Sequence, residues 1–95
     1  MTPGFEGVVR RAILTVLHEF GGEHNHAEIA AVMNELGHRV SRRDIVDHLK
    51  FLDQAGLVTI EPLEHFTVAT ITGDGIDLVE GKLTVEGVSR FKAGL

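Results

Sequence analysis

One stretch of the chain, residues 37–58, carries both end signals of a helix and the start of a strand. Ser41 can accept a hydrogen bond from a backbone N–H of the first turn, and Asp44 has the spacing of a capping-box acid. Apolar residues recur at the spacing of one helical face: Ile45, Leu49 and Leu52. Gly56 can adopt the left-handed conformation that ends a helix, and an apolar, β-prone run follows it. The pattern predicts a helix over 41–55 that leads directly into a strand.

Two further helices are predicted before this stretch, after a lead-in at residues 1–4. The first helix has apolar residues at helical spacing over four turns: Val8, Val9, Ala12, Ile13, Val16, Leu17 and Phe20. Gly21 and Gly22 end it, and residues 23–26 form a polar connector. Asn25 can cap a second helix over 27–36, which Gly37 ends. Val40 is expected to fill the turn between this helix and the next.

A two-stranded hairpin is predicted after the helix over 41–55. Its strands span 57–61 and 66–71, because both are rich in β-branched residues. Pro62 is expected to end the first strand, since proline cannot donate to a ladder. A turn at 63–65 joins the strands.

The C-terminal part is predicted to hold one short helix and an arm. Thr72 can cap the helix, Ile76 and Val79 would face inward, and Gly81 would end it. Residues 82–95 are expected to be an arm that packs on the body or on a partner.

This order of elements is typical of a winged helix-turn-helix fold. The chain is therefore expected to be mainly α with a two-stranded β-hairpin, which is the wing. Its 95 residues suffice for one domain over 1–95, with a core at about 5–81.

Composition narrows the classes of function. The chain has no cysteine, so disulfides and thiolate metal sites are excluded. No apolar run is long enough to span a bilayer, and the N-terminus lacks the pattern of a signal peptide. A cytoplasmic location and no membrane association are expected. The net charge of −5 argues against strong non-specific affinity for DNA but leaves room for a local basic patch.

Duplex DNA is the first predicted partner. In helix-turn-helix proteins the N-terminal part of the second helix of the motif meets the base edges in the major groove. Arginine suits both phosphate and guanine, because its planar fork makes paired hydrogen bonds. The candidate DNA-binding residues lie in and just before the helix over 41–55: Arg39, Ser41, Arg42, Arg43, Lys50 and Gln54.

The same region also holds charges that oppose DNA binding. Asp44, Asp47 and Asp53 balance the cations of the helix, and the expected tip of the wing carries Glu61 and Glu64. A basic patch that included Arg10 or Lys82 would favour DNA. An acidic surround would favour the alternative, an interaction module that binds a phage or host protein without DNA. Phe51 lies off the apolar face and is expected to pack under the wing or the connector, the alternative being a protein contact.

A metal site and catalysis are not expected. The acidic and histidine residues of the connector are a weak signal for zinc, because the chain has no cysteine and no longer spacing motif: Glu23, His24, His26 and Glu28. His18 is interpreted as a surface residue. Gly73-Asp74-Gly75 lacks the rest of a phosphate loop, and no catalytic triad spacing is present. The chain is therefore predicted to be no enzyme and to need no cofactor.

The segment 40–58 is similar to the recognition-helix segment of the arsenic-sensor and multiple-antibiotic-resistance types of bacterial repressor. A resemblance to small winged-helix proteins of Mu-like prophages covers nearly the whole chain. It rests on several segments, among which Leu36-Gly-His-Arg-Val-Ser-Arg and Gly87-Val-Ser-Arg are the most specific. The resemblance implies a phage-derived, DNA-associated protein, for which transcriptional regulation is expected. A homodimer, if formed, would use the first helix, the fourth helix and the arm.

Overall fold

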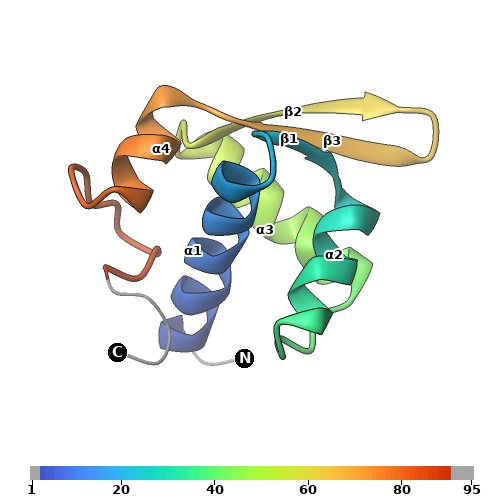
Figure 1. Ribbon diagram of the computed structural model, residues 1–95, viewed down its shortest axis with the longest axis horizontal. Helices are drawn as coiled ribbons and strands as arrows, with labels where there is room; N and C mark the ends of the chain where they lie inside the picture. The colour runs from blue at the N-terminus through green and yellow to red at the C-terminus, as the bar shows by residue number, and fades with distance from the viewer. Residues whose placement is uncertain (1–2, 91–95) are drawn as a thin grey trace.

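Four helices and three strands follow one another in the computed structural model, which describes residues 3–90 (Figure 1). Their order is α1 (Pro3–Glu19), β1 (Glu23–Asn25), α2 (His26–Glu35), α3 (Arg42–Gln54), β2 (Val58–Leu63), β3 (Phe66–Ile71) and α4 (Gly73–Val79). The four predicted helices and both strands of the hairpin are present. The first helix begins at Pro3, inside the segment that was expected to be a lead-in, because proline suits the first helical position.

The predicted β2–β3 hairpin is present, but the sheet has three strands and not the two that were expected. β1, which was expected to be a polar connector, pairs antiparallel with β3, from Glu23 opposite Thr70 to Asn25 opposite Val68. β3 is therefore the central strand, with β2 on its other side. Three polar residues carry no strand pattern of their own. They form a strand because an unpaired edge of β3 would leave its N–H and C=O groups without partners.

Pro62 does not end β2, which continues to Leu63. Pro62 lies opposite Thr67. The backbone N–H of Thr67 donates a 3.0 Å hydrogen bond to Nδ1 of His26, on the other side of β3. Because the N–H of Thr67 points away from β2, Pro62 and Thr67 form a pair of the type that exchanges no ladder hydrogen bonds. The backbone nitrogen of Pro62 therefore points away from β3, toward the outer side of the edge strand β2. The missing N–H therefore costs no ladder bond.

The core lies where α1, α2 and α3 meet beneath the sheet (Figure 1). Residues at the predicted apolar positions are fully buried there: Ile13, Leu17, Ile29, Met33, Ile45, Leu49 and Leu52. Val40 is also buried, as predicted. In α4 the buried side chain is Leu78, whereas Ile76 and Val79, which were expected to face inward, are half-buried.

The arm packs on the body over the part that the structure describes. Val88 is buried, and the N–H of Ser89 donates to the carbonyl of Gly7 at 3.1 Å. Arg11, only 7% exposed, donates to the carbonyls of Ser89 and Val79 at 3.1 and 3.2 Å. The end of α4 and the arm are thus both fastened to α1. The predicted arm also includes residues 91–95, which lie outside the described residues.

Candidate nucleic-acid interface

Local hydrogen bonds fix the start of α3. The hydroxyl of Ser41 accepts from the N–H of Asp44 at 3.0 Å, and the N–H of Ser41 donates to the Asp44 carboxylate at 3.3 Å. This is the predicted capping box. Ser41 and Asp44 are therefore parts of the helix end, and the cap holds the residues that follow it in one orientation.

The candidate DNA-binding residues are all exposed, and they lie on α3 or in the loop before it: Arg39, Ser41, Arg42, Arg43, Lys50 and Gln54. Within residues 3–90 the ion pairs involve other cations, those of Arg10, His24 and Lys82. Four exposed cations on and before α3 are therefore free of carboxylate partners in the described part of the chain. Such side chains can turn toward phosphate without first breaking an ion pair.

The helical repeat places some of these side chains in one row. Arg43 and Lys50 are seven positions apart, so they share a face at a separation of about 10 Å along the axis. Gln54 continues the same row one turn later. Asp47 lies between Arg43 and Lys50 and is exposed as well. The row can therefore offer two cations and an amide to a duplex, with one carboxylate among them.

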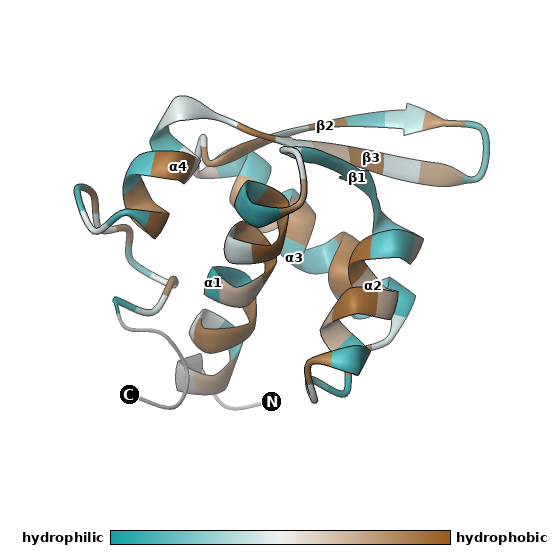
Figure 2. Ribbon diagram, viewed as in Figure 1, coloured by the Kyte–Doolittle hydropathy of each residue, from teal (hydrophilic) through white to brown (hydrophobic). Residues whose placement is uncertain are grey.

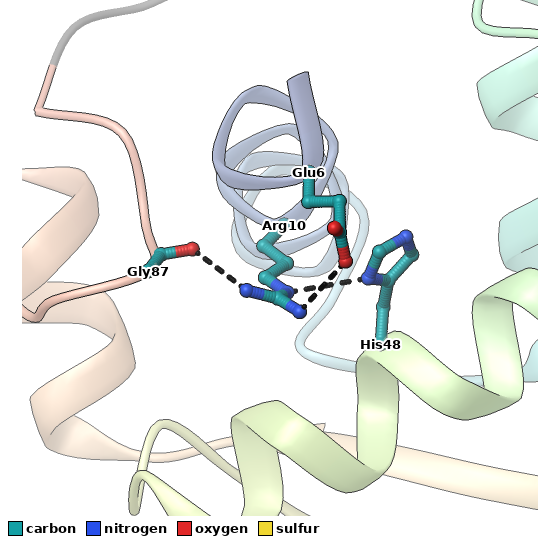
Figure 3. A network of polar contacts seen from close by, with 4 residues as sticks. All are labelled: Glu6, Arg10, His48 and Gly87. Atoms are coloured by element: carbon teal, nitrogen blue, oxygen red, sulfur yellow. Dashed lines mark hydrogen bonds and ion pairs between the residues drawn. The ribbon is translucent and has the colours of Figure 1, made fainter. Parts of the chain in front are cut away.

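Arg10 does not belong to the exposed row of α3, because its guanidinium is hydrogen-bonded to residues of α1, α3 and the arm (Figure 3). It donates to Glu6 at 3.2 Å, to His48 Nδ1 at 3.3 Å and to the carbonyl of Gly87 at 3.1 Å. Its charged carbon also lies 3.7 Å from the centre of the Phe51 ring. Phe51, which was expected to pack under the wing or the connector, thus packs against Arg10 and next to Gly87 of the arm.

An acidic cavity borders α3 on the side of α1. It has a volume of about 300 Å³ and is lined by Glu6, Arg10, Asp44, Asp47 and His48. Burial lowers the pKa of His48, and the Arg10 charge lowers it further, against the opposing effect of the three carboxylates. The ring of His48 is thus held neutral, and the cavity carries more negative than positive charge. One flank of α3 is acidic, while its outer row bears the cations.

The β2–β3 hairpin, which was expected to be a wing, adds no positive charge. The sequence has no lysine or arginine between Phe51 and Gly81, and the turn between β2 and β3 is hydrophilic through Glu64 and His65 (Figure 2). Lys82 comes after α4 and pairs with Glu80 at 3.0 Å, a hydrogen bond that raises the lysine pKa. The basic surface is therefore confined to α3 and the loop before it, and neither Arg10 nor Lys82 extends it.

The histidines near β1 have local structural partners. His24 lies 3.5 Å from the carboxylate of Glu28 and contacts the carbonyl of Phe20, while His26 accepts from Thr67. His18 is exposed, as predicted. Among residues 3–90, no group of three or more histidine and acidic side chains is arranged to hold a metal ion. No helix in this part of the chain is long and apolar enough to cross a membrane.

The sequence did not predict the hydrogen bonds by which three side chains join distant parts of the chain: Arg10, Arg11 and His48. From the sequence, Arg10 was considered only as a possible extension of a basic patch, and Arg11 and His48 were not singled out. One sequence signal could have indicated that Arg11 is buried. Arg11 is three positions after Val8 and four before Thr15, so it lies in a row at the border of the apolar face of the helix. Apart from Glu6, which is four positions from Arg10, the hydrogen-bond partners of these side chains lie 38 or more positions away in sequence, so no local pattern could indicate their roles.

Fold and surface define a small α+β protein in which a capped helix presents unpaired cations beside a three-stranded sheet. No model of a known protein family matches the chain. The chain is 36% identical over 81 residues to the uncharacterized protein gp26 of Escherichia phage Mu, a match that covers 85% of the chain and 84% of that protein. An uncharacterized protein of Haemophilus influenzae is 39% identical over 64 residues, which are 66% of the chain and 63% of that protein. The chain belongs to the family of the phage Mu protein.

Proposed function

We propose that this phage-type protein is a winged-helix regulator that binds duplex DNA through the N-terminal part of α3 and the outer row of this helix. One observation carries the proposal. Arg39, Arg42, Arg43 and Lys50 are exposed and free of ion pairs within the described residues, and three of them project from a helix with a fixed N-terminal cap. In the helix-turn-helix motif this end of the helix enters the major groove.

The distribution of charge sets the expected mode of binding. The arginines at the start of α3 and in the loop before it offer planar forks for phosphate and guanine, whereas the β2–β3 hairpin has no lysine or arginine to place on the backbone. Few phosphate contacts imply a modest salt dependence and weak affinity for random sequence. Recognition would then depend on a preferred sequence at which the row meets base edges.

A salt titration of binding to random-sequence duplex DNA tests the proposal. Fluorescence anisotropy is measured for the wild type and for the double variant Arg42→Ala/Arg43→Ala at several salt concentrations. Each lost phosphate contact reduces the slope of log K against log salt by about 0.9, so the double variant is expected to lose up to about 1.8. If the slope is the same for the two proteins, these arginines do not contact phosphate and the proposed interface is wrong.

A matched control separates the location of the charges from their number. The double variant Lys82→Ala/Arg90→Ala also removes two exposed positive charges, but none from α3. It is expected to keep the wild-type slope. If the wild type, with a folded circular dichroism spectrum, fails to bind duplex DNA even at low salt, then the DNA proposal is wrong.

The second candidate is a protein-interaction module that uses the same fold without DNA. It is favoured by the end of the β2–β3 hairpin, which exposes 59% of Leu63 and 40% of Phe66 close to Glu61 and Glu64 in the sequence. Apolar side chains at an exposed edge are typical of protein contacts rather than of phosphate contacts. Complete absence of DNA binding together with a folded protein would select this candidate.

A further inference from the structure

An apolar groove runs along the open side of α1 toward α2, away from the outer row of α3. Two cavities of about 130 Å³ each follow this line, and Val16 borders both of them. The first is lined by Val8, Arg11, Ala12, Thr15, Val16, Glu19 and Leu36. The second is lined by Val16, Phe20, His24, Glu28, Ile29 and Val32. In Figure 1, α1 is the foremost labelled helix, and none of the other labelled elements covers its forward side.

The shape of this α1–α2 groove suits a helix. Ala12 and Thr15 are small and form its floor, while Leu36 and Phe20 project at its sides with 61% and 53% of their surface exposed. From Val8 to Glu19 the floor spans about 16 Å of α1, the length of about three helical turns. An amphipathic helix binds such a surface through apolar anchors at i, i+3, i+4 and i+7.

The charges at the rim select the partner. Glu19 and Glu28 are exposed acids at the border of the α1–α2 groove, and one carboxylate oxygen of Glu28 also accepts from the N–H of Asn25 and lies 3.5 Å from His24. The one arginine in the lining, Arg11, is buried, and its terminal nitrogens donate to the carbonyls of Ser89 and Val79. The reachable charge in the lining is therefore negative. A second copy of this chain would bring like charges together, whereas a basic partner would meet opposite ones.

We propose that the α1–α2 groove binds a basic amphipathic helix of a partner protein, with an apolar stripe on the groove floor and lysine or arginine against Glu19 and Glu28. This binding is independent of the DNA proposed to contact α3, because the two surfaces share no residue. A protein with both activities would link a partner to a DNA site. Either activity can fail without the other.

Three synthetic helical peptides serve as probes, and isothermal titration calorimetry measures their binding. The first has leucine at the i, i+3, i+4 and i+7 positions and lysine elsewhere. The second keeps the leucine stripe and replaces lysine by glutamate, and the third has the composition of the first in scrambled order. The first peptide is expected to bind at least about tenfold more tightly than the other two. Only this peptide combines an apolar stripe that fits the groove with positive charge that matches its acidic rim.

Variants of the protein locate the binding site. Glu19→Lys and Leu36→Ser change exposed residues of the groove, so both variants are expected to fold. Each is expected to lower the affinity for the first peptide by about fivefold or more. The matched control is Glu64→Lys/Leu63→Ser on the wing, which changes the same residue types and is expected to keep wild-type affinity. Arg42→Ala/Arg43→Ala should also keep it, which separates this test from that of DNA binding.

Three outcomes would overturn the proposal. The first is equal binding of the scrambled peptide, which would mean that charge alone attracts it. The second is peptide-induced NMR shifts on α3 or the wing instead of at Val8, Ala12 and Val32. The third is a concentration-dependent dimer of the protein alone that Leu36→Ser abolishes, because the occupant of the groove would then be a second copy.

Discussion

The Nε atom of Arg10 donates a 3.3 Å hydrogen bond to Nδ1 of His48, which joins α1 to α3 across 38 positions of the sequence. Since a guanidinium can only donate, Nδ1 must accept, and the neutral ring carries its proton on Nε2. A second proton on Nδ1 would replace the acceptor by a donor that faces a cation. Burial lowers the pKa of His48 in the same direction, so the folded state favours the neutral ring.

We expect this protein to lose stability as the pH falls below about 6.5, the pKa of an unperturbed histidine. The folded pKa of His48 is lower than the unfolded one, so the unfolded chain binds the proton first and stability falls until the folded ring also titrates. Urea unfolding midpoints at about pH 7.5 and about pH 5 measure this loss. His48→Asn keeps an acceptor oxygen near the Nδ1 position without titrating, so its loss should be smaller. An equal loss in both proteins would contradict the assignment.

Arg11 is expected to stabilise the fold by fastening α4 and the arm to α1. Arg11→Met keeps much of the apolar volume but leaves the carbonyls of Val79 and Ser89 without their charged donor. The free energy of unfolding should fall by about 1.5–3 kcal/mol. Urea unfolding measures it, and amide exchange at Ser89 should become faster. Arg42→Met, at an exposed position, is the control and should change stability by no more than about 0.5 kcal/mol. Similar losses in the two variants would contradict the fastening role.

The capped helices were predictable because their signals are local. Ser41 and Asp44 lie within one turn of each other, and their capping box forms as the spacing predicts. The exposure of Arg43 and Lys50 on α3 was predictable in the same way, since it follows from the helical repeat. What could not be predicted depends on residues distant in sequence. β1 is a strand only because β3 offers it an edge, and Arg10 is removed from the basic surface by His48 and Gly87.

Pro62 shows how a sound local rule can fail. Proline ends a strand where its missing N–H would break a ladder bond. Whether it does so depends on which of two alternating pair types it occupies and on whether its strand is an edge. Both conditions are set by the pairing of β2 with β3, which fixes Pro62 opposite Thr67. Single-residue patterns carry no information about that register.

Ser41 was predicted to contact DNA, and its hydroxyl is also the cap of α3. We expect Ser41→Ala to lower the free energy of unfolding by about 1 kcal/mol, because the N–H of Asp44 loses its acceptor. Ser41→Asn supplies another capping oxygen and should retain nearly wild-type stability. Thermal and urea unfolding compare the three proteins. If Ser41→Asn is as unstable as Ser41→Ala, the capping interpretation is wrong.

Gly75 allows α4 to approach the start of β2 closely. A Cβ atom at Gly75 would lie 2.2 Å from the carbonyl oxygen of Leu57 and 2.6 Å from a side-chain carbon of Ile71. Backbone cannot move aside as a flexible side chain can, and the Leu57 carbonyl also accepts from the N–H of Thr72. We expect Gly75→Ala to lower the free energy of unfolding by about 3 kcal/mol or more.

Gly73, two residues earlier in the same helix, provides the matched control for this prediction. A Cβ atom there would meet nothing within 4 Å, so Gly73→Ala is expected to be neutral or to stabilise by up to about 1 kcal/mol through the unfolded chain. Both variants add one methyl group to α4, so their helix propensities change alike. Urea unfolding followed by circular dichroism compares them. Equal stabilities would show that α4 can shift away from β2, and the close approach at Gly75 would then not be needed by the fold.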